Sequence, residues 1–419
     1  MNKPAANDPT TGASQLVGWG REAVFYQILV DRFRRGASGG PTGDPARPEF
    51  CGGDLPGVIQ SLDYLRRLGV TALWLSPINC TAAYHGYHVT NFEEVEPRFG
   101  GMAAFQALLQ AAKPDLKIVL DWVPNHVHVS HPFFQEAVRR KTSRYRDWFY
   151  FEPHGRYRCF LDVTELPKLN LDHPEARHYM IQCALRWLDL GVDGLRLDHV
   201  LGPSLGFWRE FYATIKGRHP AAFLFGEVLF AGIQKKFLPT IELPRKHQYF
   251  RTEQSGHSVM APVMKEYTSV FDGLLDFEFQ RILKRFVARP RTRPADAAVQ
   301  ARLDAHYSGF PAGCSLPSFL DNHDLNRFLF EARGDQARLR QAAHIQFQQA
   351  QPPIIYYGTE VGLSQARSIK GNFGDLQARQ LMPWDHVDQE LLAFYTRLIH
   401  ERRGCLIEDV RGNTKLATK

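Results

Sequence analysis

The chain has 419 residues, of which 44% are hydrophobic and 23% charged, as in a globular protein with a substantial core. This composition excludes a disordered or collagen-like chain, and no apolar run is long enough to cross a membrane. The formal net charge is +7, from 51 basic and 44 acidic residues. Because the basic residues are mostly scattered arginines, we interpret the charge as a solvated surface and expect no nucleic-acid or membrane partner.

The cysteines and the N-terminus bear on the cellular compartment. Six cysteines form no CxxC pair, so we expect free thiols in a reducing environment. Residues 1–20 form a polar arm without the apolar stretch that a signal peptide needs. Together these features predict a cytoplasmic protein.

Short apolar runs alternate with amphipathic stretches along the rest of the chain. Strands are expected at 23–30, 69–78, 117–126, 193–199, 222–228, 314–321 and 352–358, and helices at 54–68, 105–112, 175–190, 204–217, 335–350 and 389–402. Repeated strand–helix units predict a parallel sheet covered by helices. The length alone leaves one large α/β barrel or two domains as alternatives.

The positions of polar residues at the strand ends favour one large barrel over two domains. Asp121, Asp198, Glu227 and Asp324 each stand at or just beyond the end of an expected strand. In a closed barrel such ends converge on one face, where the active site lies. An open doubly wound sheet would usually add a glycine-rich phosphate loop, and no GxGxxG or GxxxxGK[ST] motif occurs. The predicted fold is therefore α/β, a (β/α)8 TIM barrel.

Two intervals break the alternation. Residues 127–171 are aromatic, charged and turn-rich, and they are too many for a plain loop. We expect a small excursion over the active face there. Residues 229–268 form a second irregular stretch, expected to be a loop or a helical insertion.

The strand-end carboxylates suggest acid–base chemistry. Arg196 and Asp198 share one face of a strand, and an adjacent guanidinium keeps a carboxylate ionised, as a nucleophile requires; a surface ion pair is an equal alternative. Glu227 ends an apolar strand, where burial raises its pKa toward that of a general acid, although it could instead cap the following loop. His323 and Asp324 suit a metal pair, an acid–base pair or a clamp for sugar hydroxyls.

Taken together, paired carboxylates near Tyr84, Tyr87 and Trp122 suit glycoside chemistry, because aromatic rings offer flat faces to sugars. A metal-dependent barrel hydrolase is the alternative from the residues alone. It needs more converging histidines, and the HVH at 126–128 is the only such pattern.

Five motifs then carry a resemblance. DWVPNH (121–126), LPKLN (166–170), GLRLDHV (194–200), FGEV (225–228) and FLDNHD (319–324) resemble, in order, the short sequence regions of the α-amylase family of retaining glycoside hydrolases. Supporting stretches at 25–33, 52–78, 84–100 and 352–364 extend the resemblance over about residues 20–402.

The resemblance implies a domain layout. The catalytic barrel would comprise residues 21–126 and 172–404, and residues 127–171 would be domain B, inserted after the third strand. Residues 405–419 are expected to be a polar tail, with the family's C-terminal β-sandwich absent or vestigial.

The resemblance also implies a retaining mechanism through a covalent β-glycosyl-enzyme. Asp198 is implied as the nucleophile, Glu227 as the acid/base and Asp324 as the third carboxylate. The residues implied in substrate binding are His85, Tyr87, His126, Arg196, His323, Asp375 and Arg379. The implied partners are malto- or isomalto-oligosaccharides or related α-glucosides, with hydrolysis and transglycosylation both open.

Departures from the family pattern refine these expectations. Lys168 stands where calcium-dependent amylases have an aspartate ligand, so we expect no metal and no cofactor. This lysine form is similar to neopullulanase, cyclomaltodextrinase and oligo-1,6-glucosidase-like relatives. His199 follows the implied nucleophile, where a small or aliphatic residue is more usual, which leaves the linkage preference open. A catalytically inactive binding or chaperone protein is the alternative, and inactive members commonly lose a carboxylate that is present here.

Overall fold

Eight short parallel strands close into a barrel at the centre of the molecule. The computed structural model describes residues 18–36, 42–229, 260–290, 296–371 and 373–416. The barrel strands are β1 (Phe25–Ile28), β2 (Ala72–Leu75), β5 (Lys117–Trp122), β8 (Gly194–Leu197), β9 (Phe223–Gly226), β10 (Gly273–Leu274), β11 (Ser318–Phe319) and β12 (Pro353–Tyr356). They pair in chain order, and β12 returns to pair with β1. Parallel bridges from Gly273 to Ser315 and from Asp276 to Ser318 close the ring between β10 and β11, so the barrel prediction is confirmed.

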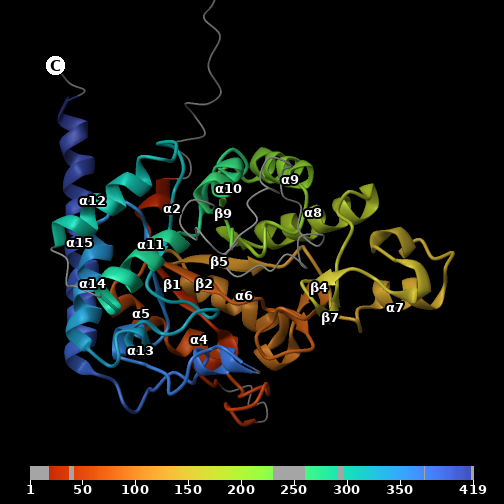
Figure 1. The fold of residues 1–419 in the computed structure, drawn as a ribbon, viewed down its shortest axis with the longest axis horizontal. Coiled ribbons are helices and arrows are strands. Elements are labelled where there is room, and N and C mark those ends of the chain that lie inside the picture. Colours follow the sequence, from red (N-terminus) through yellow and green to blue (C-terminus); the bar gives the residue numbers. More distant parts are fainter. Residues whose placement is uncertain (1–17, 37–41, 230–259, 291–295, 372, 417–419) are drawn as a thin grey trace, which may run out of the picture.

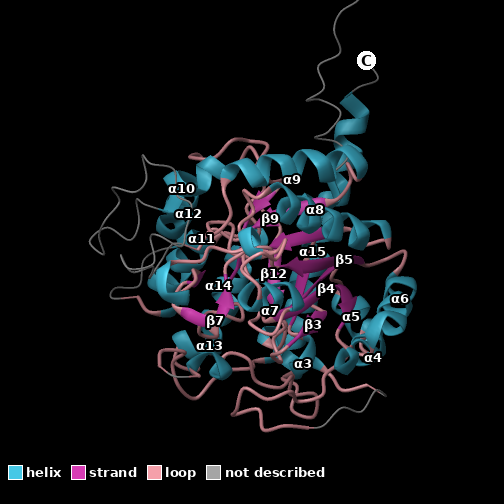
Figure 2. Ribbon diagram, turned by 90° about the vertical axis from the view of Figure 1, so that its right-hand side faces the viewer, coloured by secondary structure: helices cyan, strands magenta, loops and turns pink. Residues whose placement is uncertain are grey.

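Helices surround the strands as an outer layer, and Figure 2 shows the strands gathered inside them. The principal helices are α4 (Leu55–Gln60), α5 (Leu62–Leu68), α6 (Gly101–Ala112), α8 (Pro174–Asp189), α9 (Leu205–Arg218), α10 (Met260–Tyr267), α11 (Phe277–Leu283), α12 (Asp296–Tyr307), α14 (Gln336–Gln348) and α15 (Gln389–Leu416). Shorter ones are α2 (Gly18–Glu22), α3 (Val30–Phe33) and α13 (Phe328–Glu331). None of the described helices has both the length and the apolar composition that a membrane crossing needs.

Aromatic side chains fill the barrel interior. Phe25 of β1 and Phe225 of β9 have ring centroids 5.6 Å apart, and Trp74 of β2 meets Phe225 edge-on at 5.7 Å. Both faces of every barrel strand are buried, as expected of parallel strands under a cover of helices. This packing fixes the strand ends that carry the polar residues.

Helices α11, α12 and α13 were not predicted, and three further elements differ from the sequence prediction. The helix expected at 54–68 is divided into α4 and α5 at Ser61, whose hydroxyl donates back to the Gly57 carbonyl. Strand β10 was not predicted, because its apolar run covers only residues 273–275, between Asp272 and Asp276. α15 continues through the boundary predicted at residue 404, where Gly404 weakens a helix without ending it as proline would.

Long connections lie at one end of the barrel. The connection after β5, the third barrel strand, contains α7 (Pro132–Arg139), β6 (Cys159–Phe160), β7 (Val163–Pro167) and the 3₁₀ turns at Arg146–Trp148 and Pro153–Gly155. The connection after β2 contains the hairpin of β3 (Asn79–Thr81) and β4 (Val89–Val95). Figure 1 places α7, β7 and β4 together, far from α15. Most of the predicted N-terminal arm, and residues 230–259 of the second irregular stretch, lie outside the described residues.

Candidate active site

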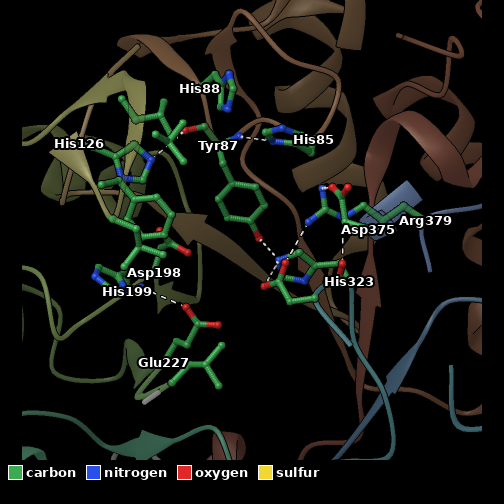
Figure 3. A pocket seen from close by; sticks show the side chains of 16 residues that line it. His85, Tyr87, His88, His126, Asp198, His199, Glu227, His323, Asp375 and Arg379 are labelled. Carbon is green, nitrogen blue, oxygen red and sulfur yellow. Dashed lines mark hydrogen bonds and ion pairs between the residues drawn. The ribbon is translucent and has the colours of Figure 1, made fainter. Parts of the chain in front are cut away.

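A cavity of about 380 Å³ lies at the C-terminal ends of the barrel strands (Figure 3). Its size falls in the range of small-molecule sites. The lining residues are His85, Tyr87, His88, His126, Phe160, Leu161, Val163, Leu166, Asp198, His199, Glu227, Leu229, His323, Asp324, Asp375 and Arg379. Every predicted site residue lines this cavity except Arg196, which lies beneath it within the barrel.

Arg196 organises the carboxylates. The alternation of β8 directs Arg196 to the side that Asp198 shares, and the guanidinium is fully buried. Its Nη1 lies 2.7 Å from Oδ1 of Asp121 and 2.8 Å from Oδ1 of Asp198. Its Nη2 lies 2.7 Å from Oε1 of Glu227. One cation therefore binds carboxylates from three successive barrel strands and holds Asp198 and Glu227 close together.

The pKa of Glu227 is raised to about 7 from its ordinary value of 4.5. Burial is the main cause, opposed by Arg196, while the charges of Asp324 and Asp121 add to the increase. The backbone N–H of His199 donates to Oε2 of Glu227 over 3.2 Å and fixes the carboxyl group. A carboxyl group with this pKa exchanges its proton near neutral pH, as a general acid must.

Asp198 and Asp324 lie in different electrostatic surroundings. Burial raises the pKa of Asp198, and the neighbouring Arg196 acts against this increase. Burial also acts to raise the pKa of Asp324, but His323 and Arg379 outweigh it and lower the pKa below its usual value. Asp324 is therefore ionised at neutral pH.

Arg379 binds the Asp324 side of the cavity. Its Nη2 donates to Oδ1 of Asp324 at 2.9 Å, and its Nη1 lies 2.6 Å from Oδ2 of Asp375. Its Nε donates to the carbonyl of His323. Asp375 belongs to the 3₁₀ helix Gly374–Gln377, after β12, so the eighth barrel connection supplies this pair. The predicted Asp375 and Arg379 are thus brought together beside Asp324.

A chain of hydrogen bonds runs across the barrel mouth through Tyr87. Its hydroxyl donates to Oδ2 of Asp121 at 2.8 Å and lies 2.7 Å from Nε2 of His323. The amide Nε2 of Gln27 lies 2.7 Å from Nδ1 of His323. Because an amide nitrogen only donates, Nδ1 accepts and Nε2 carries the imidazole proton toward Tyr87 and Asp324. Burial lowers the pKa of His323 to about 3, so the ring is neutral.

The remaining predicted histidines, His85 and His126, line the side of the cavity formed by the connections after β2 and β5. The Nδ1 of His85 accepts from the backbone N–H of Tyr87 at 3.2 Å. Nε2 of His126 lies 3.2 Å from the carbonyl of Tyr87. Burial lowers the pKa of both rings, to about 3 for His126, so both are neutral hydrogen-bonding groups.

Several residues that line the cavity, or that contact its lining residues from within the barrel, were not predicted as site residues. Gln27, which contacts His323, has a sequence signal, as the one polar residue in the apolar strand AVFYQILV. Asp121 was noticed at a strand end, but without a role. For His88 and the apolar residues of β6, β7 and the turn between them, no sequence pattern indicated a place in the site. Only the folding of the connections brings these residues to the cavity.

The junction of the barrel with residues 127–171 does not fit the calcium ion of the family. A calcium site needs a cage of oxygen ligands. Here Lys168 is buried and pairs by its backbone with His126. Burial is the main cause of the lowered pKa of His199, and the positive charge of Lys168 adds to it. An ammonium group repels a divalent cation. No group of three or more His, Cys, Asp or Glu side chains suited to a metal occurs among the described residues.

The fold and cavity define a barrel enzyme whose carboxylates are arranged as in glycoside hydrolases. The model of the alpha amylase catalytic domain matches residues 27–397. The chain therefore belongs to the α-amylase family of glycoside hydrolases.

Comparisons with individual relatives support this family assignment. The chain is 34% identical to alpha-amylase 2 of Dictyoglomus thermophilum over 92% of its length, and 32% identical to neopullulanase 2 of Thermoactinomyces vulgaris over 95%. It spans 64% and 65% of the length of these two relatives. Among solved structures, the cyclic α-maltosyl-(1→6)-maltose hydrolase of Arthrobacter globiformis, in complex with its substrate, has a TM-score of 0.77 at 29% identity, covering 92% of this chain and 83% of that one.

Proposed function

We propose that this protein is a retaining α-glycosidase that cleaves α-glucosidic linkages of malto- or isomalto-oligosaccharides or related α-glucosides. The observation that carries the proposal is the Arg196 guanidinium, which holds Asp198 and Glu227 side by side. Retaining glycosidases place their two carboxyl groups about 5 Å apart. Relatives named as neopullulanase and cyclomaltodextrinase, and a related hydrolase solved in complex with maltose, support this substrate class.

In the proposed first step, Glu227 gives its proton to the glycosidic oxygen while Asp198 attacks the anomeric carbon. The aglycone leaves as an alcohol, and an ester joins the sugar to Asp198. In the second step, Glu227 takes a proton from an incoming water as that water attacks the anomeric carbon. The ester breaks, and a product with the original α-configuration is released.

The neighbouring groups would serve the sugar that forms the ester. Asp324, with Arg379 and Asp375, is placed to bind ring hydroxyls, and neutral His323, His85 and His126 can add hydrogen bonds without adding charge. Tyr87 would present its ring as a stacking face. When a second sugar or another alcohol replaces water, the same second step becomes transglycosylation.

The test is a substrate panel of maltose, maltotriose, isomaltose, cyclodextrin and starch, read by chromatography, with proton NMR of the first-formed anomer. We expect cleavage of at least one oligosaccharide and initial release of the α-anomer. An initial β-anomer would contradict retention. Failure to cleave any substrate, together with measurable oligosaccharide binding, would favour the inactive binding protein.

The proposed location is the cytoplasm. It is supported by Cys51, Cys80, Cys159, Cys183 and Cys314, which are free thiols in the described part of the chain. Cell fractionation tests it, and recovery of the protein in an oxidising extracellular fraction would contradict it.

A further inference from the structure

One side of the cavity is apolar. Five lining residues, Phe160, Leu161, Val163, Leu166 and Leu229, carry side chains without a polar atom, and we call them the apolar wall. Four of them come from β6, β7 and the turn between these strands, and the fifth follows β9. The other side of the cavity carries the Asp324, Asp375 and Arg379 network.

The apolar wall lies on the Glu227 side. Leu229 follows Glu227 by two residues. His199 donates its backbone N–H to Glu227, and its ring meets Phe160 edge-on with centroids 4.8 Å apart. Figure 3 shows His199 and Glu227 on one side, and His323, Asp375 and Arg379 on the other. A general acid contacts the leaving group, so the apolar wall faces the aglycone.

The backbone at Leu161 supports a binding role for the wall. Its φ is +52°, in the left-handed region that leucine rarely adopts. Such conformations persist where the surrounding structure imposes them, often at ligand sites. Leu161 nevertheless lines the cavity, where an asparagine or glycine would suit the backbone better.

We propose that the aglycone site selects α-glucosides whose aglycone is hydrophobic, an alkyl or aryl group. This inference rests on the proposed α-glycosidase function. Although the His126 and His199 rings beside Phe160 can form hydrogen bonds, a sugar aglycone would also bring hydroxyl groups against five side chains that offer none, which costs free energy. An alkyl chain loses no hydrogen bond there and gains burial. In the reaction, Glu227 protonates the glycosidic oxygen, the alkyl alcohol leaves, and water then hydrolyses the Asp198 ester to give the free sugar.

The experiment compares kcat/KM for the methyl, ethyl, butyl and hexyl α-glucosides, and for the same series of α-maltosides. All leaving groups are alkoxides of similar basicity, so a trend reports on binding of the chain and not on its chemistry. We expect kcat/KM to rise about two- to fourfold per methylene in at least one series. A flat or falling trend in both series would overturn the inference. Loss of activity on every alkyl glycoside and on maltose and maltotriose would instead reject the proposed function.

Variants localise the effect. Leu161→Asn suits the left-handed backbone and places an amide on the apolar wall, and Val163→Thr exchanges a methyl for a hydroxyl. We expect each to lower the butyl-to-methyl ratio of kcat/KM about threefold or more. Because this ratio does not depend on the fraction of folded enzyme, misfolding cannot imitate the result. The matched controls are Leu381→Asn and Val138→Thr, at exposed positions outside the cavity. An equal fall in the ratio for a control, or no fall in either wall variant, would overturn the inference.

Discussion

Two groups of residues that meet on the Glu227 side of the cavity, the carboxylates around Arg196 and the apolar wall, make different kinds of contact. Around Arg196, the charged groups are buried and linked by short contacts, with Asp121, Asp198 and Glu227 within 2.8 Å of the guanidinium. The five side chains of the apolar wall offer no hydrogen bonds, and four of them stand on the connection after β5. The comparison suggests that rigid strand ends hold the reacting groups while a connection shapes the space for the leaving group.

This division has an electrostatic basis. Five carboxylates gather around two guanidinium groups, three at Arg196 and two at Arg379. The charges of Asp121, Asp198, Glu227 and Asp324 act on one another within the buried site. Displacement of any one of them changes the protonation of the others. The apolar wall carries no charge, so its residues act on the acid–base groups through burial and not through direct charge interactions.

The largest expected effect tests the barrel side. Asp198→Asn and Glu227→Gln should each lower kcat/KM for the best oligosaccharide by about 10⁴-fold or more, because one removes the attacking group and the other the acid. Steady-state kinetics measures this loss, and thermal unfolding checks that the fold persists. Near-normal activity of both variants would show that the site is misassigned.

Removal of the central cation should damage stability as well as activity. Arg196→Ala leaves three buried carboxylates without their counterion, and we expect a loss of about 3–5 kcal/mol in the free energy of unfolding. Urea unfolding at several pH values measures it. The loss should shrink toward acid pH, as the carboxylates become protonated. A loss that does not vary with pH would contradict the electrostatic explanation.

The pKa of Glu227 sets the alkaline limit of activity. With a pKa of about 7, the general acid loses its proton above neutral pH, so kcat/KM should fall about tenfold per pH unit well above pH 7. Because the folded pKa exceeds the ordinary value of 4.5, the stability that this group contributes is present below pH 4.5 and is lost as the pH rises to about 7. A pH–rate profile tests the assignment. Residual activity of Glu227→Gln that kept the same alkaline limb would assign the pKa to another group.

A smaller effect is expected from Tyr87→Phe. This variant keeps the ring but removes the hydroxyl between Asp121 and His323, so we expect about a tenfold loss in kcat/KM. The pH profile should also shift, because Asp121 influences the pKa of Glu227. Tyr64→Phe is the control, since its hydroxyl binds Glu360 and Tyr64 does not line the cavity. Equal activity losses in the two variants would indicate a general packing effect.

The smallest effect concerns the junction that places the apolar wall over the barrel. Lys168 does not suit a calcium site, so excess EDTA should leave the thermal midpoint unchanged within about 1 °C. Differential scanning calorimetry measures it. A large decrease that calcium reverses would show that a metal joins the two regions after all.

The sequence already indicated much of the barrel and its charged groups. Seven of the eight barrel strands have apolar runs long enough to be recognised, and Asp198, Glu227 and Asp324 stand at strand ends, where a barrel must bring them together. β10 lies in a run of three apolar residues between Asp272 and Asp276, which is too short to be recognised. Phe160 and Leu161 could not be placed at the cavity, because their position depends on how a long connection folds back.

The sequence by itself therefore indicated the fold class, through periodicity and strand-end residues, and the family, through the resemblance of five short motifs, since all of these are local properties of the chain. Only the tertiary structure decided that Arg196 binds three carboxylates at once, and that Tyr87 contacts both Asp121 and His323, the latter 236 residues further along the chain. The shift of the Glu227 pKa and the apolar character of the aglycone side also depend on it. These properties arise from distances between residues far apart in the chain, and burial in a shared cavity makes those distances energetically important.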